Sequence, residues 1–359
     1  MAIQSDQLKS NPKDHDPMSQ SSGIRKAGSP IYIAGLMTVL LIVLALTHLA
    51  HGAHNISLHD VWSSFTGDFN RTGDKTTHTI IWSIRLPRLL TAIIVGSSLA
   101  VSGAALQGLF RNPLADPYVL GIASGGAFGA ALAMLLTTQL IFGATTGAFL
   151  GAGLAGVMVL GLAHDGASYR LNSVLLAGVA VGLIFSALLS LVLLFAERQA
   201  GDMLSWLLGH VGHTSWSQLT VMAALTFVGI IAIQSYASAL DVALLGENAA
   251  QGIGVQFSNL KKMVLLSTFI LVASAVAYCG IIGFVGLVVP HTMRLLSGPS
   301  HKYLIGLSAI GGAILLVAAD LVARIILPER ELPVGVITAL IGGPFFLFLL
   351  RKDGQHVGH

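Results

Sequence analysis

Residues 171–195 read LNSVLLAGVAVGLIFSALLSLVLLF, a run of apolar and small residues without a single Asp, Glu, Lys or Arg. As a helix, a stretch of roughly 20 such residues is long enough to cross the hydrocarbon core of a bilayer. A transmembrane β-barrel would show short segments of alternating hydrophobicity instead. This run therefore predicts a membrane-spanning helix.

Similar runs recur along the chain of 359 residues, which is 54% hydrophobic and only 10% charged. Soluble domains average about 25% charged residues, so the composition predicts an all-α, polytopic membrane protein. The eighth run begins with three glycines between residues 280 and 290, and it could be a half-crossing. Ten spans are compatible with two inverted halves of five helices. The ten expected spans are 31–49, 86–108, 118–138, 143–163, 171–195, 217–237, 261–279, 281–296, 303–326 and 333–350.

Glycine is abundant inside these runs, with 41 residues in the chain. One series recurs every four residues from Gly121 to Gly129, and a second recurs from Gly143 to Gly151. Small residues at this spacing allow helix backbones to approach closely in lipid. We therefore expect the two series to be packing surfaces.

The two ends of the chain are polar. Residues 1–30 are rich in serine and predict a disordered tail, residues 31–352 the transmembrane domain, and residues 353–359 a second short tail. The first apolar run begins only at Ile31 and no clear A-x-A site follows it, so we do not expect a cleavable signal peptide. With the N-terminus inside, most of the 19 lysines and arginines fall on the inner side, which predicts that both tails are cytoplasmic.

The sequence contains no phosphate-binding loop of the form G-x-x-x-x-G-K-[ST], and no H-E-x-x-H, C-x-x-C or G-x-S-x-G motif. Its single cysteine, Cys279, cannot form an internal disulfide. A net charge of +3 does not suggest nucleic acid as a partner. These features predict a transport subunit with no cofactor or metal of its own. Energy for uphill transport must then come from a partner or from an ion gradient.

An ion-coupled secondary transporter would need ionisable side chains inside its spans. Asp320 is the main one, and it precedes Arg324 by four residues, where an ion pair on one helix face is expected. A role in docking or transport is the alternative for this pair. One pair near a helix end is weak support for a proton pathway, so a separate ATPase is the favoured energy source.

Several longer motifs occur in an order and spacing that are familiar from one transporter family. They are RLPRLL (85–90), GAALQGLFRNPLADP (103–117), LGIASGGAFG (120–129), GFVGLVVPH (283–291), ADLVAR (319–324) and ELPVGVITALIG (331–342). From about residue 31 to residue 352, the sequence closely resembles the FecCD family of ABC importer permeases. Members of that family serve the uptake of iron–siderophore complexes, haem and cobalamin.

The resemblance implies a homodimer of ten-helix subunits in the bacterial inner membrane. It also implies two ABC ATPase subunits, which use ATP and Mg²⁺, and a periplasmic substrate-binding protein. The expected cargo is an iron chelate, either a ferric siderophore or haem. Cobalamin is the alternative within the family. An ion-coupled transporter and a non-transporting membrane scaffold are the alternatives outside it.

The resemblance further assigns Arg85, Arg88 and Arg324 to the docking of the binding protein. A planar guanidinium suits this role because it binds a carboxylate through two parallel hydrogen bonds. Anchoring to lipid headgroups is the alternative for the first two. By the same resemblance, Asn112 and Leu114 in a proline-containing turn, and Asn172, are expected at the cytoplasmic gate. A plain helix connector is the alternative for the turn.

The resemblance also implies that the inner segment at about 240–256 couples the permease to its ATPase. Glycines there permit a turn between two short helices that would sit in a groove of the ATPase. An ordinary cytoplasmic loop is the alternative. The expected coupling residues are Leu245, Gly246, Glu247, Asn248, Ala249 and Gly254.

His48, His51 and His54 are spaced by three residues near the outer end of the first span. This spacing could place ligands for haem iron or another metal on one side of a helix end. Solvated loop histidines are the alternative.

Overall fold

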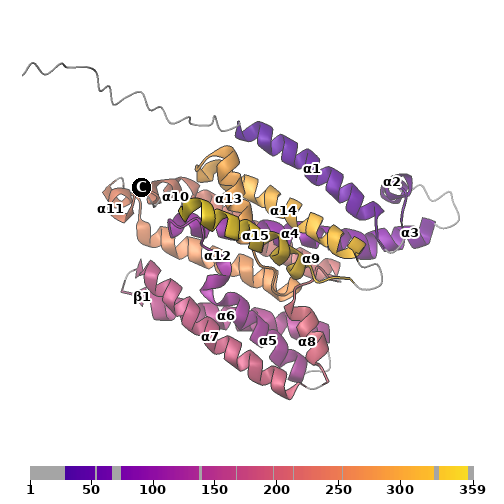
Figure 1. The fold of residues 1–359 in the computed structure, drawn as a ribbon, viewed down its shortest axis with the longest axis horizontal. Coiled ribbons are helices and arrows are strands. Elements are labelled where there is room, and N and C mark those ends of the chain that lie inside the picture. The colour runs from indigo at the N-terminus through magenta and orange to yellow at the C-terminus, as the bar shows by residue number, and fades with distance from the viewer. Residues whose placement is uncertain are drawn as a thin grey trace, which may run out of the picture.

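The computed structural model is a bundle of long helices joined by short helices and turns (Figure 1). The residues that it describes are 29–52, 55–66, 74–136, 140–166, 168–196, 198–212, 214–252, 254–326 and 331–354.

The ten longest helices correspond to the ten expected spans. They are α1 (Pro30–Ala50), α4 (Leu86–Leu109), α5 (Ile122–Leu136), α6 (Leu140–Ala163), α7 (Leu171–Phe195), α9 (Trp216–Ser235), α12 (Phe257–Cys279), α13 (Val285–Ser297), α14 (His301–Ile326) and α15 (Val334–Gly354). Among the described residues, seven helical stretches are long and apolar enough to cross a membrane, and α5 and α15 contribute shorter apolar helices. The expected all-α, multi-pass fold is confirmed, and the inverted five-plus-five arrangement stays a prediction.

Shorter elements connect the long helices. They are α2 (Leu58–Thr66), α3 (Asp74–Ile80), the π-helical turn η1 (Ile81–Arg85), the 3₁₀ turn η2 (Pro117–Leu120), α8 (Ala200–Leu207), α10 (Ala237–Ala243), α11 (Glu247–Gly252) and the strands β1 (His164–Asp165) and β2 (Ser168–Tyr169). The two strands form an antiparallel hairpin in which His164 lies opposite Tyr169.

Helix α13 is the half-length element that its glycines suggested. It has 13 residues, which span only about 20 Å at 1.5 Å per residue. The backbone before it is irregular, because Gly280 and Phe284 both have positive φ angles, of 70° and 67°. The chain therefore enters the bundle as a non-helical segment and leaves it as a short helix. Such backbone is tolerated at membrane depth only where it is buried in protein or lines a water-filled cavity.

Helix α4 is the centre of the bundle, and 18 of its residues are buried. It packs against α9, α12, α13 and α14. At its closest approach to α13, the space for a Cβ atom on Gly103 is already taken by the backbone oxygen of Gly286. Between α5 and α6, Gly125 faces the backbone of Gly151 and Gly129 faces that of Gly147 in the same way. The expected packing role is confirmed for these four glycines.

Replacing Gly103 by alanine is therefore expected to push α13 away from α4 and to lower the stability of the fold by about 1–3 kcal/mol. Gly161 is the matched control, because nothing lies within 4 Å of its Cβ position and it also lies in a helix. Its alanine variant should melt at the wild-type temperature or slightly above it. Thermal unfolding of the detergent-solubilised protein measures both. Equal melting temperatures for the two variants would contradict the close contact.

Polar side chains gather at the two ends of the bundle. In Figure 1, α2, α3 and α8 lie toward the right, whereas α10, α11 and the β hairpin lie toward the left. We name the first the network end, formed by Leu49–Gly52, Arg85–Arg88, Asp320–Arg324 and Glu331. We name the second the coupling end, formed by Arg111–Pro117, His164–Tyr169 and Ala237–Gly252.

Candidate functional site

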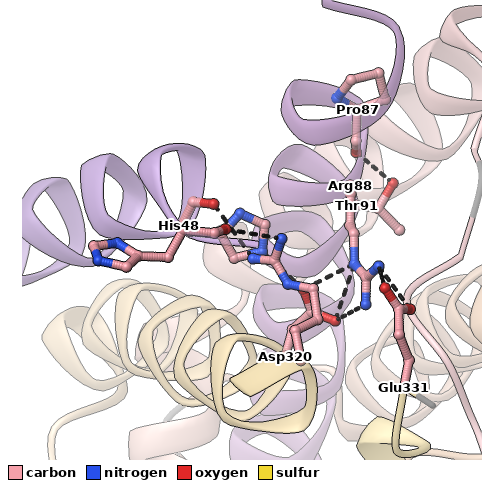
Figure 2. A network of polar contacts seen from close by, with 8 residues as sticks. His48, Pro87, Arg88, Thr91, Asp320 and Glu331 are labelled. Carbon is pink, nitrogen blue, oxygen red and sulfur yellow. Dashed lines mark hydrogen bonds and ion pairs between the residues drawn. The ribbon is translucent and has the colours of Figure 1, made fainter. Parts of the chain in front are cut away.

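Asp320 is the centre of the network end. Its side chain is 0% exposed, and it lies near the end of α14 between α1 and α4 (Figure 2). One carboxylate oxygen lies 2.7 Å from Nε2 of His48. Arg88 donates to the carboxylate through Nε, at 3.0 and 3.2 Å, and through Nη2, at 2.8 Å. The buried charge is thus neutralised by a bidentate guanidinium, the arrangement that makes a buried carboxylate tolerable.

Two further arginines close the C-terminus of α1. Arg324 donates through Nη1 and Nη2 to the backbone oxygens of His51 and His48, at 3.4 and 3.3 Å. Arg85, of which 5% is exposed, donates to the oxygen of Leu49. The last carbonyls of a helix lack partners within the helix and carry a partial negative charge. The arginines therefore supply both hydrogen bonds and charge complementarity to the end of α1.

The expected ion pair between Asp320 and Arg324 is present but long, with Nε and Oδ2 3.6 Å apart. The stronger partners of the carboxylate come from α1 and α4. Helical spacing correctly predicted that the two side chains are neighbours. It did not predict that Arg88 would take the shorter hydrogen bonds, because Arg88 precedes Asp320 by 232 residues.

Glu331 holds the outward side of Arg88 (Figure 2). Nη1 of Arg88 lies 2.9 and 2.8 Å from the two carboxylate oxygens of Glu331. The Glu331 side chain is 59% exposed, whereas that of Arg88 is 11% exposed. The three arginines thus lie together at one end, as expected, and each has an acceptor within the chain. Their docking role stays a prediction.

The three histidines do not form a common site in the part of the chain that the structure describes. His48 is fully buried near the end of α1 and bound to Asp320, so it is not the solvated histidine of the alternative interpretation. His51 is exposed, and its Nδ1 lies 3.1 Å from the backbone oxygen of Thr47. His54 lies outside the described residues. Among the described residues, no group of three His, Cys, Asp or Glu side chains could hold a metal ion.

The coupling end contains a polar cavity of about 730 Å³ between the turn after α4, the β hairpin and the start of α12. Asn112 and Asn172, two of the expected gate residues, both line it. So do Arg111, Glu247 and Lys261. The structure therefore brings gate candidates and a coupling candidate to one cavity.

Leu114 faces a different cavity. This one is apolar, has a volume of about 500 Å³, and is also lined by Phe284 and by Phe346 of α15. The turn between the cavities is held by its own side chains. Asn112 Oδ1 accepts a hydrogen bond from the backbone of Leu114 at 2.9 Å, and Asp116 Oδ1 accepts one from that of Tyr118 at 2.8 Å. Burial raises the pKa of Asp116.

The short helix α11 is tied to α12 by an ion pair that sequence reasoning missed. Lys261 is 5% exposed, and its Nζ lies 3.0 and 3.2 Å from the two carboxylate oxygens of Glu247. Gly246 and Gly254 flank α11 with positive φ angles of 106° and 91°, so the expected glycine turns are confirmed. Leu245 is exposed, and Asn248 and Ala249 lie within α11. The only sequence signal for Lys261 was its place in a basic pair at a helix start.

A model of the FecCD transport family matches residues 40–352 of the chain. The chain belongs to this family. It is therefore the transmembrane permease subunit of an ABC importer, as the motifs indicated.

Named relatives of this FecCD permease differ in their cargo. The hemin transport system permease HmuU of Yersinia pestis is 38% identical over 337 residues, which cover 92% of this chain and 98% of the relative. The cobalamin import permease BtuC of Halobacterium salinarum is 41% identical over 277 residues, or 77% and 74% of the two chains. A solved structure described as a metal-chelate type ABC transporter in an inward-facing conformation is 32% identical. It matches with a TM-score of 0.80 over 90% of this chain and 99% of that one.

In this FecCD permease, α10 is fastened to the start of α14. Asp241 accepts hydrogen bonds from the backbone nitrogen of His301 at 2.7 Å and from Oγ of Ser300 at 3.0 Å. Its carboxylate also lies 2.7 Å from Nδ1 of His301, whose side chain is 0% exposed. The ring of His301 in turn fills the space beside Gly108 of α4. A displacement of α10 would thus directly move the start of α14 and change its packing against α4.

Replacing Asp241 by alanine is expected to destabilise the first turn of α14 by about 1–3 kcal/mol, because it leaves buried donors without acceptors. Faster amide hydrogen exchange at the start of α14 would show this effect. Ser300→Ala removes only one of the same hydrogen bonds and serves as the control. Unchanged protection in the Asp241 variant would show that the carboxylate does not hold the two helices together.

Proposed function

We propose that this chain moves an iron chelate, either haem or a ferric siderophore, from the periplasm to the cytoplasm. Two copies of the chain would form the pathway, two separate ATPase subunits would supply the energy with ATP and Mg²⁺, and a periplasmic binding protein would deliver the cargo. The chain itself holds no cofactor in this proposal. The near-complete match to a hemin permease supports an iron chelate. Cobalamin remains the alternative cargo, supported by the match to BtuC.

In this proposal the ATPase acts on the permease through the coupling end. There the glycine-flanked helix α11 is bound to α12 through Glu247 and Lys261. The same two side chains line the polar cavity that reaches Asn112 and Asn172. A partner that moves α11 would therefore act directly on the mouth of this cavity. We accordingly assign the coupling end and both termini to the cytoplasmic side of the inner membrane.

The network end then faces the periplasm, where Arg85, Arg88 and Arg324 would meet the binding protein. Asp320 is an unsuitable proton carrier, because Arg88 and His48 already occupy its carboxylate at short distances. This argues against ion coupling, which would need a carboxylate that is free to gain and lose a proton. Energy must then enter through the coupling end.

Reconstitution in proteoliposomes tests the proposal. The permease, its ATPase and a set of candidate binding proteins are combined with ATP, and uptake of haem, a ferric siderophore and cobalamin is compared. ATP-dependent uptake of haem or the siderophore is expected. Preferential uptake of cobalamin would replace the cargo assignment. Uptake by the permease alone under a proton gradient would overturn the energy assignment.

A further inference from the structure

We propose that Glu331 is an internal competitor for the docking site on Arg88. In the permease without its partner, Glu331 occupies the outward side of the Arg88 guanidinium. An acidic side chain of the binding protein displaces it on docking. The inference rests on the proposed docking role of the arginines. It adds that a carboxylate of the permease itself must leave Arg88 before the binding protein can bind there.

The two carboxylates bound to Arg88 are held very differently. Asp320 is 0% exposed and is also bound by His48 and Arg324, so its bond to Arg88 is a fixed part of the fold. Glu331 is 59% exposed, and among the described residues its carboxylate has hydrogen bonds only to Arg88. Exposed ion pairs contribute little to stability, whereas buried ones are costly to break. Glu331 is therefore the partner that can leave.

The geometry of the guanidinium makes Glu331 and an acidic side chain of the binding protein compete for the same donor. Nε and Nη2 of Arg88 point to Asp320, and Nη1 points to both oxygens of Glu331. An arginine has five N–H donors in a fixed planar arrangement, and each edge matches one carboxylate. Because Asp320 holds Nε and Nη2, a carboxylate arriving from the periplasm would compete with Glu331 for Nη1.

Release of Glu331 would also loosen the segment that leads into α15. Glu331 lies three residues before Val334, where α15 begins. Next to it, the backbone nitrogen of Leu332 bonds to the oxygen of Ala323 in α14 at 3.3 Å. The bond from Glu331 to Arg88 adds α4 to this anchorage. Docking on Arg88 would thus remove this link between α4 and the segment that leads into α15.

This matters because α15 reaches from the network end toward the expected gate. Its Phe346 lines the same apolar cavity as Leu114. Near its start, Gly335 fits against the backbone oxygens of Leu208 and Ile281, with no room for a Cβ atom. The first turn of α15 is therefore closely packed. Glu331, which precedes this turn in the chain, is exposed.

The test uses the permease–ATPase complex in nanodiscs and the substrate-free binding protein that supports uptake in the reconstitution assay. Glu331→Gln keeps the shape of the side chain and removes its charge. We expect it to lower the Kd for the binding protein by roughly two- to fivefold, the effect of removing one exposed competing ion pair. Asp202→Asn removes another exposed carboxylate, from α8 near the same end, and should leave the Kd within about twofold.

The Arg88→Gln background separates the inference from the proposed function. If Glu331 acts through Arg88, Glu331→Gln should give no gain in affinity when Arg88 is already replaced. An equal gain in affinity in the wild-type and Arg88→Gln backgrounds would show that Glu331 acts only through the overall charge of the surface. This result would overturn the proposal. An unchanged or weaker affinity for Glu331→Gln, with Arg88→Gln weakening binding, would reject the competitor and retain the docking site. No effect of Arg88→Gln would reject the docking site itself. A cooperative unfolding transition well above the assay temperature establishes that each variant is folded, including Arg88→Gln, which should melt below the wild type because it leaves buried Asp320 without its counter-charge.

Discussion

Replacing Asp320 by alanine is expected to lower the stability of the folded permease by about 3–5 kcal/mol. The variant leaves Arg88, whose side chain is only 11% exposed, without its buried counter-charge. It also removes the hydrogen-bond partner of His48. Removing one member of a buried ion pair costs far more than the net value of the pair, because the remaining charge stays desolvated.

The single cysteine provides the measurement. Cys279 is fully buried at the end of α12, so its reaction with a thiol-reactive fluorophore reports unfolding and no cysteine has to be introduced. The Asp320→Ala variant should react at a clearly lower temperature than the wild type. Glu331→Gln is the matched control, because it removes the exposed carboxylate of the same arginine and should cost less than about 1 kcal/mol. Similar melting temperatures for the two variants would show that burial does not set the cost.

A second variant distinguishes lost pairing from lost packing. Replacing Arg88 by methionine in the Asp320→Leu background removes both charges and keeps apolar volume. The double variant should be more stable than Asp320→Leu alone, because two well-packed apolar side chains often replace a buried ion pair without loss of stability. No recovery would indicate that the hydrogen bonds to α1, rather than the pair itself, hold this end together.

The helices were predictable from the sequence because each span is a continuous apolar run. The half-length of α13 was also foreshadowed, since the glycines between residues 280 and 290 interrupt its run. Such signals are local, and the membrane makes them strong by requiring internal backbone hydrogen bonding.

The polar sites were only partly predictable. The position of Arg88 at one end of the bundle followed from its motif, but its acceptors Asp320 and Glu331 lie 232 and 243 residues away. His48 was expected near the outer end of the first span as a metal ligand or a solvated histidine, because nothing near it in sequence suggests a buried acceptor. Tertiary pairing over such distances leaves no periodic pattern in the sequence.

Replacing Lys261 by methionine is expected to reduce uptake per ATP hydrolysed by roughly five- to tenfold, within the usual range of coupling free energies. Lys261 and Glu247 connect α11 to the body of the permease through two hydrogen bonds. Without that connection, a partner could move α11 while the cavity beside Asn112 stays unchanged. ATP hydrolysis should therefore continue in the reconstituted complex while transport falls.

Lys262 is the matched control, because it is the neighbouring lysine and its side chain is exposed. Its methionine variant removes the same charge from the same turn of α12 and should transport normally. Exchange of the two charges, with lysine at position 247 and glutamate at position 261, keeps an ion pair and should restore part of the coupling. If the exchanged pair transports no better than the Lys261 variant, the ion pair is not what transmits the movement of α11. If Lys261→Met and Lys262→Met lose transport equally, general positive charge near the ATPase is the cause. The buried position of Lys261 argues against that outcome, because a side chain only 5% exposed acts on what it touches rather than on a distant surface.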